Sequence, residues 1–454
     1  MTKRSQMMRL KASAFRLKSG KFQPVDSRYK SIVEELEARG VMPKTAPALK
    51  PTRHALGVLG ITRWPIFEDF KNHPEKIIIV AGTNGKGSVC ATLETLLTAA
   101  GERVGLYTSP HLIEMTERFR IGGRDIDEAL FCDTFEAVEE DVSYMGLTHF
   151  EMLTVMAAHI FASGKFTLPV DRIILEVGMG GLWDATNAIP HGACVITKLG
   201  IDHRYFLGKT LPEIAANKFA VVPTSTEIGR SALVVHTKLP KEVSALAEEI
   251  KKKTASRWIE AETGKLNASP GPKYEISTKW GSAEIALAGE RGLENTMTAL
   301  TMFEQLGYDP AQFLGALKNV RWPGRMELAA ETPVPIYLSG DHNEQGAQSL
   351  LELLPNYPRK HLHVLAGIGS DKDFEKMLSL FESIPESSLY LTETPFKGRK
   401  IGEYGEWTKR AKGAWADPAQ AFSEVLARAR PGDAVLVTGS LYLVGAIRLL
   451  LKRG

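Results

Sequence analysis

A glycine-rich segment, Gly82-Thr83-Asn84-Gly85-Lys86-Gly87-Ser88, is the strongest chemical signal in the sequence. It follows a β-branched apolar run, Lys76–Ala81, and leads into a stretch with helical spacing of apolar residues, Ser88–Ala100. Glycines let backbone N–H groups approach phosphate oxygens, a helix N-terminus adds positive potential, and Lys86 can reach the terminal phosphates. The segment therefore predicts a nucleotide-binding loop, with a ligand-free glycine turn as the alternative.

The position after the lysine departs from the usual phosphate loop. A serine or threonine normally stands there and its hydroxyl holds magnesium. Here Gly87 fills that position, and Ser88 comes one residue later. A metal ligand must therefore come from elsewhere in the chain.

Further short motifs follow this loop in order, and they are YTSPHL (107–112), ER (117–118), THFE (148–151), LEVGMGG (175–181), DATN (184–187), IDH (201–203), LGKT (207–210), PGR (323–325), DHN (341–343), DKD (371–373) and TGSL (438–441). The ordered series resembles the folylpolyglutamate synthase/dihydrofolate synthase family, a branch of the Mur ligase superfamily. The resemblance runs from about Leu56 to Arg448, which is most of the chain.

The resemblance implies an ATP-dependent amide ligase. ATP would phosphorylate the carboxylate of a pteroate- or folate-like acid, and the amine of glutamate would attack the acyl phosphate. Phosphoryl transfer depends mainly on positioning and charge neutralisation, which fits a phosphate loop, one or two Mg²⁺ ions and fixed cations. ATP would be a substrate, as would glutamate and the acid.

The resemblance also implies metal ligands at Ser109, Glu176 and His203. Hard oxygen ligands suit magnesium, and Ser109 would supply the hydroxyl that is missing after Lys86. Glu176 ends an apolar run, where an unpaired carboxylate would be costly. Taken alone, Ser109 could be a turn residue, and His203 could be a loop histidine satisfied by its neighbours.

Lys218 matches the lysine that is carbamylated in the family, where the added carboxylate binds a second magnesium. Asn217 and Phe219 depart from the family's local pattern, so a surface lysine on a helix is the alternative. With this match, the residues expected to take part in catalysis are Lys86, His203 and Lys218.

Other matches imply ATP contacts beyond residues 82–88. Asn295 matches an adenine-contacting asparagine, although the family's His-Gln pair before it is missing. Arg325 matches an arginine that reaches the phosphates, with an interdomain salt bridge as the alternative. His342 belongs to a segment in which Ser339 replaces the ATP-contacting aspartate and Asp341 replaces an alanine, so either Asp341 takes over this contact or the contact is weakened.

The acceptor pocket matches the family less closely. The family's arginine-leucine pair after Gly181 is replaced by Leu182-Trp183, so a cation is lost. Trp183 could stack on a flat heterocycle or fill core space. The residues expected to bind this substrate are Pro110, His111, Thr148, Phe150, Trp183 and Asp184.

Apolar runs alternate with helical patterns, which predicts an α/β fold with mostly parallel sheet. The expected strands are 76–81, 172–177, 193–198, 232–236, 334–338, 361–366, 389–392 and 434–437. A lysine-rich helix is expected near 241–253, and hairpins or loop from 263 to 282. The predicted division is a basic N-terminal extension (1–45), an ATP-binding Mur-ligase-type domain (46–321) and a smaller, Rossmann-like glutamate-ligase domain (322–454).

Composition excludes several classes of protein. The 454 residues carry a net charge of +3, which argues against a nucleic-acid binder that works by bulk electrostatics. No apolar stretch reaches the ~18 residues that span a bilayer. Three scattered cysteines indicate a reducing compartment, so we expect a cytoplasmic protein. We also expect a monomer. Seven bases without an acid in the first 25 residues leave organellar targeting as the alternative.

Two rival functions remain open. Another Mur-type ligase could join a different amino acid to a different carboxylate, which the changes at Trp183, Ser339 and Asn217 would favour. A non-catalytic nucleotide-binding homologue is the second alternative. The matches at Ser109, Glu176, His203 and Lys218 argue against it.

Overall fold

The computed structural model describes residues 17–18, 21–22, 25–40, 48–267, 274–396 and 398–453. The chain divides into two compact units. Unit 1 contains residues up to 111, 115–262 and 298–313, and unit 2 contains 112–114, 263–297 and the chain from 314 onward. The predicted boundary between 321 and 322 remains a prediction.

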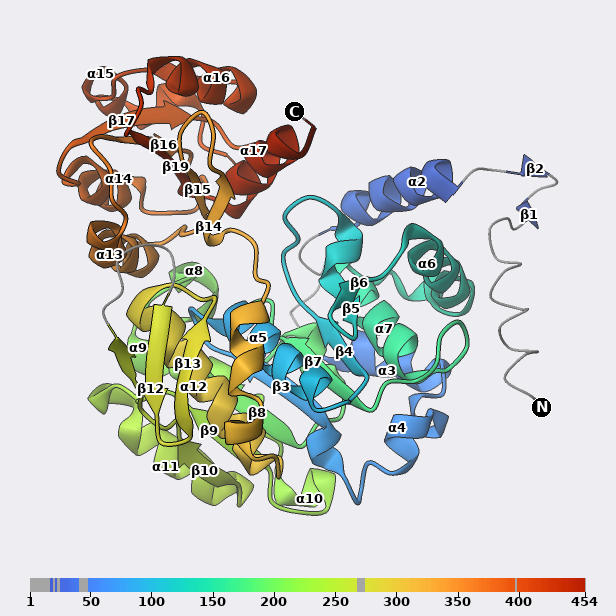
Figure 1. Cartoon of the computed structure of the whole chain (residues 1–454). Helices are drawn as coiled ribbons and strands as arrows, with labels where there is room; N and C mark the ends of the chain where they lie inside the picture. The colour runs from blue at the N-terminus through green and yellow to red at the C-terminus, as the bar shows by residue number, and fades with distance from the viewer. Residues whose placement is uncertain are drawn as a thin grey trace. The chain divides into compact units, whose positions relative to one another are not determined.

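An eight-stranded sheet forms the centre of unit 1 (Figure 1). Six strands are parallel, and β5 and β6 pair antiparallel at one edge. The strand order is β10 (Arg257–Glu260), β9 (Leu233–His236), β8 (Ala193–Ile196), β3 (Ile77–Ala81), β7 (Arg172–Glu176), β4 (Val104–Tyr107), β5 (Phe119–Ile121) and β6 (Arg124–Asp125). The four strands predicted for this part of the chain are confirmed within two residues at either end, whereas β4, β5, β6 and β10 were not predicted.

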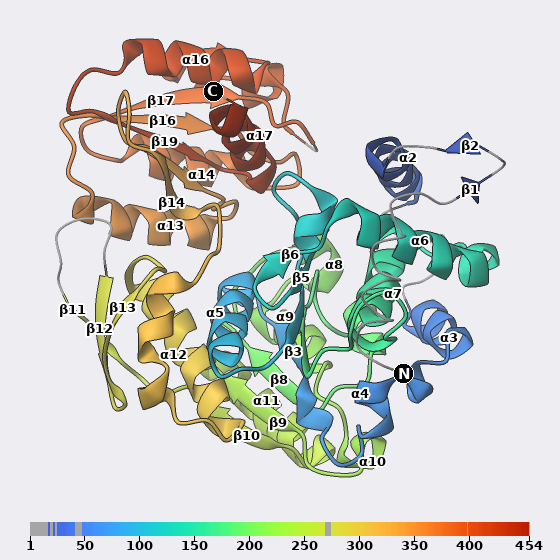
Figure 2. The same ribbon diagram turned by 45° about the vertical axis from the view of Figure 1, so that its right-hand side comes forward.

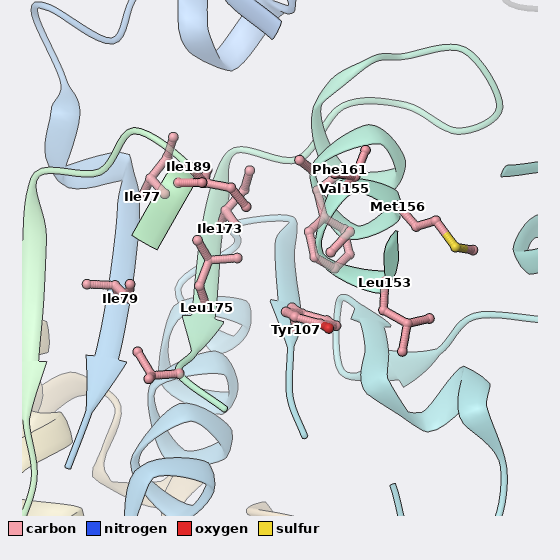
Figure 3. Packing of buried hydrophobic residues seen from close by; sticks show 14 of the residues in the cluster. Ile77, Ile79, Tyr107, Leu153, Val155, Met156, Phe161, Ile173, Leu175 and Ile189 are labelled. Atoms are coloured by element: carbon pink, nitrogen blue, oxygen red, sulfur yellow. The ribbon is translucent and has the colours of Figure 1, made fainter. Parts of the chain in front are cut away.

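Helices pack on this sheet, and their apolar side chains share a hydrophobic core with the strands. The predicted helix after the phosphate loop is α5, and it packs on β3, β4 and β7. Figure 3 shows alternate residues of β3 and β7, such as Ile77 and Ile173, in the same core as Phe161 of α7. The helices are α2 (Val25–Ala38), α3 (Lys50–Val58), α4 (Pro65–Glu68), α5 (Lys86–Ala99), α6 (Glu128–Val142), α7 (His149–Ala162), α8 (Arg204–Leu207), α9 (Leu211–Phe219), α10 (Ser225–Ile228) and α11 (Lys241–Thr254).

Helix α2 lies inside the segment that the sequence assigned to an N-terminal extension. It packs on α6, and its Tyr29 and Leu36 side chains are buried. Arg28 pairs with Asp133 at 2.9 Å and with Glu136 at 3.0 Å. Helix α2 is therefore part of the folded unit rather than a solvated extension, while residues 1–16 lie outside the described residues.

Unit 2 contains two sheets. The hairpins expected near 263–282 are confirmed as a three-stranded antiparallel sheet, which consists of β11 (Lys265–Asn267), β12 (Tyr274–Thr278) and β13 (Gly281–Ile285). A six-stranded sheet has the order β14 (Arg325–Ala330), β15 (Ile336–Ser339), β19 (Ala434–Thr438), β16 (Leu362–Ala366), β17 (Ser387–Thr392) and β18 (Ala414–Trp415). Only β14 runs antiparallel in it, and the four predicted strands correspond to β15, β16, β17 and β19.

Helices cover both faces of the six-stranded sheet. Figure 2 shows α16 on one side of it and α13 and α14 on the other. The C-terminal apolar run forms a strand followed by a helix, as predicted. The helices of this unit are α12 (Gly289–Gln305, which ends in unit 1), α13 (Glu344–Leu353), α14 (Phe374–Glu382), α15 (Trp407–Arg410), α16 (Pro418–Arg428) and α17 (Leu441–Arg453). Among the described helices, none has the length and apolar character needed to cross a membrane.

A buried ion pair fixes the start of β7. Arg172 donates to both carboxylate oxygens of Glu102, at 2.6 and 2.8 Å, and to the carbonyl oxygen of Glu75 at 3.0 Å. The Tyr308 hydroxyl donates to the same carboxylate. Burial alone would raise the pKa of Glu102, but the guanidinium outweighs it, and the pKa lies below its ordinary value of 4.5.

We expect Arg172→Ala to lower the free energy of unfolding by about 3–5 kcal/mol, because it leaves a buried carboxylate without its partner. Because the folded pKa of Glu102 is lowered, the pair's contribution is present above pH 4.5 and is lost as pH falls through the folded value. Urea unfolding at several pH values measures both effects. Arg124→Ala, an exposed arginine of β6, is the control, and an equal loss in both variants would contradict the assignment.

Candidate active site

The carboxyl ends of four neighbouring strands meet at one edge of the unit 1 sheet. In the registers, Glu176 lies beside Val80, Leu175 beside Tyr107, and Ala81 beside Ile196. Parallel strands place the residues that follow them at a common edge, where ligands of open α/β sheets bind. The loops after β3, β4, β7 and β8 contain the predicted phosphate-binding and metal-binding residues.

Close backbone packing requires glycine at the start of the phosphate loop. Gly82 has φ of 150°, and a Cβ added there would lie 1.9 Å from the Oγ1 atom of Thr197. Thr83 donates its N–H to the carbonyl oxygen of Lys198 and its hydroxyl to that of Gly200, both at 3.0 Å. No side chain caps α5, so the N–H groups of its first turn remain available to a phosphate.

Two lysines converge on one carbonyl oxygen of this loop. Lys218, at the end of α9, donates to the oxygen of Gly82 at 2.8 Å, and Lys86 donates to the same oxygen at 3.3 Å. Lys218 is only 4% exposed, so the surface-lysine alternative is wrong. Burial, together with the nearby charge of Lys86, lowers the pKa of Lys218 to about 7, against the opposing effect of Asp202 and Asp184.

Ser109 and Glu176 are in direct contact. The Ser109 N–H donates to the Oε2 atom of Glu176 at 3.1 Å, and the Glu176 carboxylate is buried at the end of β7. Burial raises the pKa of the Cys90 thiol, and the charges of Glu176 and Lys86 act on it in opposite directions. Both charges therefore lie near the first turns of α5.

His203 occupies a left-handed backbone conformation with φ of 48°, which costs a residue other than glycine about 1–3 kcal/mol. Its N–H donates to the Oδ1 atom of Asp202 at 2.8 Å, and its ring Nε2 lies 3.9 Å from Oδ2. The sequence reading did not single out Asp202. Within the described residues, no group of three or more His, Cys, Asp or Glu side chains is arranged to hold a metal.

Local hydrogen bonds fix two of the residues predicted to bind the acceptor. Asp184 accepts N–H bonds from Met179 at 2.9 Å and Thr186 at 3.1 Å. Thr148 forms a capping box with Glu151 at the start of α7, so its hydroxyl has a structural partner. The structure thus gives Asp184 and Thr148 positions fixed by local hydrogen bonds.

Aromatic side chains flank the Gly178–Trp183 loop. A Cβ on Gly178 would lie 2.7 Å from the Cζ atom of Phe150, so this ring packs against the loop. Trp183 is 51% exposed, so the core-filling alternative is wrong. It lines an open hollow of about 510 Å³ together with Ala48, Leu49, Lys50, Arg53 and His54.

His111, which follows Ser109 and Pro110, is a neutral imidazole. Arg118 donates from Nε to the His111 Nδ1 atom at 2.9 Å. Burial and this arginine lower the pKa of His111 to about 3. His111 can therefore accept a hydrogen bond from a cation near neutral pH, but it cannot supply positive charge.

The remaining predicted ATP contacts lie in unit 2. Ser339 donates its hydroxyl to the Oδ2 atom of Asp341 at 2.7 Å, and Arg291 donates to the two Asp341 oxygens at 2.7 and 3.3 Å. Burial would raise the pKa of Asp341, but Arg291 outweighs it and the pKa is lowered. Arg325 lies opposite Ser339 in the β14–β15 register, and its charge also acts on Asp341.

Two further predicted ATP contacts in unit 2 are His342 and Asn295. His342 contacts the carbonyl oxygen of Gly340 through Nδ1 at 2.9 Å. Asn295 is buried on α12, one turn after Arg291. Each unit thus contains its own group of predicted site residues. Arg291, which bonds Asp341, was not among the residues predicted from the sequence.

Comparisons with known proteins bear on these groups. The family model described as "Mur ligase, glutamate ligase domain" matches residues 324–441. A dihydrofolate synthase/folylpolyglutamate synthase of Buchnera aphidicola (subsp. Acyrthosiphon pisum) is 30% identical over 378 residues, covering 81% of this chain and 87% of that protein.

Two of the solved structures that resemble this chain cover 94% of it. An Escherichia coli FolC in complex with DHPP and ADP has a TM-score of 0.78 at 25% identity and covers 94% of this chain and 99% of its own. A bifunctional folylpolyglutamate synthase/dihydrofolate synthase with Mn, AMPPNP and L-glutamate bound has a TM-score of 0.78 at 26% identity, with the same coverage. The chain therefore belongs to the dihydrofolate synthase/folylpolyglutamate synthase family, whose members are ATP-dependent Mur-type ligases.

Proposed function

We propose that this enzyme joins L-glutamate to the carboxylate of a pteroate- or folate-like acid at the expense of ATP. The observation that supports this most directly is the meeting of three features at one sheet edge. These are the phosphate loop, the Ser109–Glu176 contact, and the buried Lys218 amine on the carbonyl oxygen of Gly82. Family membership indicates the class of reaction. These residues place charged and polar groups where the phosphates and a metal ion would need them.

The proposed reaction has two steps. A carboxylate oxygen of the acceptor attacks the terminal phosphorus of ATP, the bond to the bridging oxygen breaks, and ADP leaves. The neutral amine of glutamate then attacks the acyl carbon, the carbon–oxygen bond to phosphate breaks, and orthophosphate leaves while the nitrogen loses a proton. Lys86 and the N–H groups of α5 would balance the phosphate charge in the first step.

The donor chemistry of three predicted residues suits magnesium. Glu176 offers a buried carboxylate, and Ser109, whose N–H donates to that carboxylate, offers a hydroxyl. His203 offers an imidazole whose Nε2 atom lies 3.9 Å from the Oδ2 atom of Asp202. Magnesium, when bound, would neutralise charge on the phosphate oxygens. We assign these three side chains to hold it, and we assign Lys218 the same task after its amine has added CO₂ to form a carbamate.

The remaining predicted residues would bind the acceptor or the nucleotide. We propose that Pro110, His111, Thr148, Phe150, Trp183 and Asp184 surround the acceptor, the first pair beside Ser109 and the others around the Gly178–Trp183 loop. In unit 2 we assign Asn295, Arg325 and His342 to ATP. Asp341, already bonded to Arg291 and Ser339, would position Arg291 and the strand end rather than bind the nucleotide directly.

A cytoplasmic location and a monomeric state remain predictions from the sequence. The three cysteines are free and buried, which accords with a reducing compartment. The proposed partners are the small-molecule substrates alone.

The first test is a substrate panel scored by ADP and phosphate release, with Lys86→Ala as the key variant. We expect turnover with ATP, glutamate and a pterin acid, and a loss of at least about a hundredfold in Lys86→Ala, because the phosphates lose a fixed cation. Lys71→Ala, an exposed lysine of the same unit, is the control. Unchanged ADP release in Lys86→Ala, or turnover only with other acid and amine pairs, would refute the assignment.

The second test concerns Lys218. Because its pKa is lowered to about 7, half of the amine is neutral near pH 7 and can add CO₂, and protonation blocks this as pH falls. We expect ligation to drop in CO₂-depleted buffer below pH 7 and to recover on addition of bicarbonate. A carbamate carbonyl signal from isotopically labelled bicarbonate should be present in the wild type and absent in Lys218→Arg. A rate that is indifferent to CO₂ would rule the carbamate out.

The third test concerns the Arg291–Asp341 pair. We expect Arg291→Met and Asp341→Asn each to raise the KM for ATP more than they lower kcat, because each leaves a buried partner without its bond. The double variant should lose less than the sum of the two, with a coupling free energy of about 0.5–3 kcal/mol. Chemical unfolding and ATP kinetics on all four proteins measure it. Strict additivity would show that the pair has no shared role.

A further inference from the structure

Helix α2 is fixed on α6 at both of its ends (Figure 1). Near its start Arg28 pairs with Asp133 at 2.9 Å, and Arg39, the residue directly after the helix, pairs with Glu139 at 2.7 Å. Two ion pairs at opposite ends keep the helix from sliding along α6. Its free side is therefore held in place relative to the rest of unit 1.

The first contact beyond α6 joins α2 to the turn η3 (Met115–Arg118). The backbone N–H of Met115 donates to the Tyr29 hydroxyl at 2.9 Å, and both residues are buried. The Tyr29 ring packs edge-to-face on Phe131 of α6, with the ring centroids 5.4 Å apart. Because this packing fixes the ring, the hydroxyl holds the start of η3 at a defined distance from α2.

The other end of η3 holds a loop with predicted site residues. Arg118 donates from Nε to the His111 ring at 2.9 Å, and its carbonyl oxygen accepts the N–H of Thr108 at 2.9 Å. These two bonds enclose Ser109 and Pro110 between them. Because η3 is a single turn, a shift of its first residue would be passed on to this loop.

The second contact joins α2 to the start of α7. The Nδ1 atom of His149 lies 2.9 Å from the carbonyl oxygen of Leu36, and the His149 backbone N–H donates to the carbonyl oxygen of Gly40 at 3.3 Å. A carbonyl oxygen only accepts, so Nδ1 carries the proton. His149 stands between Thr148 and Phe150, which are both predicted to bind the acceptor, so this segment is also held by α2.

Both contacts come from one face of a short, stiff element. Tyr29 and Leu36 are seven residues apart, which is two helical turns and about 10 Å along the axis. The two segments that they hold also lie near each other, because burial and the charge of Arg118 lower the pKa values of both His111 and His149. One helix thus sets the relative position of two neighbouring segments.

We infer that α2 is a clasp that sets the separation of segments 108–118 and 148–150, with Tyr29 and His149 as positioning residues for the acceptor. Both residues act through bonds between α2 and these segments rather than by touching the substrate. The phosphate loop is fixed by other bonds, from Thr83 to Lys198 and Gly200, so ATP affinity should not follow acceptor affinity. The inference rests on the proposed function for the identity of the acceptor.

The kinetic test compares Tyr29→Phe, which removes the hydroxyl and keeps the ring, with His149→Phe, which removes the N–H donor. We expect each to raise the KM for pteroate about three- to tenfold, the effect of one lost hydrogen bond, and to leave the KM for ATP within about twofold. His149→Asn keeps a side-chain N–H for Leu36 and should return the KM toward the wild-type value. Tyr144→Phe, at an exposed tyrosine of unit 1, is the matched control.

The double variant Tyr29→Phe/His149→Phe tests whether one helix couples the two segments. If α2 sets their separation, releasing one segment already removes the constraint, and the double variant raises the KM by less than the product of the single effects. The full product would overturn the clasp. Arg28→Gln weakens the hold of α2 on α6 and should raise the same KM, whereas Glu34→Gln, at an exposed residue of α2, should not.

Hydrogen exchange tests the coupling without any ligand. Tyr29→Phe removes a bond to Met115 alone, yet we expect faster exchange of backbone amides both in 108–118 and in 148–152. The amides of the phosphate loop, 82–88, should keep their wild-type rates. Faster exchange confined to 108–118 would show that α2 does not transmit the change, and would contradict the inference.

A binding test separates the clasp from the proposed function. Equilibrium dialysis with pteroate and, separately, with ADP needs no turnover. Weaker pteroate binding with unchanged ADP binding in both single variants supports the clasp even where no ligation is detected, in which case only the proposed function fails. Equal weakening of both ligands would indicate a general loss of structure, and unchanged pteroate binding would show that the α2 contacts serve stability alone; either result overturns the inference.

Discussion

The site depends on two amines, one of them buried, that converge on a single carbonyl oxygen. Lys86 and Lys218 both donate to Gly82, and water is excluded from Lys218. Burial lowers the pKa of Lys218 to about 7, and the nearby charge of Lys86 adds to this effect, so the Lys218 amine loses its proton readily. A triphosphate would offset both positive charges, so the loop suits a ligand of high negative charge.

In unit 2 the buried charged group is a carboxylate instead of an amine, and an arginine of the same unit pairs with it. Asp341 is buried, and Arg291 is hydrogen-bonded to it across 50 residues of sequence. Ser339 donates to the same carboxylate. The three residues thus form one hydrogen-bonded arrangement around a buried negative charge.

The sequence predicted the elements that depend on local pattern. Strands β3, β7 and β8 are continuous apolar runs that end in polar motifs, so both their extent and the meeting of Gly82 and Glu176 could be foreseen. Strand β4 could not, because its Gly105 breaks the pattern. A Cβ at Gly105 would lie 2.6 Å from the Phe161 ring, a contact set by tertiary packing. The Arg291–Asp341 bond and the hollow beside Trp183 likewise arise from residues distant in sequence.

The position of Cys90 has a practical consequence. Its thiol is on α5, directly behind the phosphate loop, and like Cys132 and Cys194 it is fully enclosed by neighbouring side chains. Its raised pKa keeps it in the unreactive form. Alkylating reagents should consequently label this enzyme only when the surrounding sheet opens, so the labelling rate would report opening of unit 1 under native conditions, with the natural cysteines as the probes.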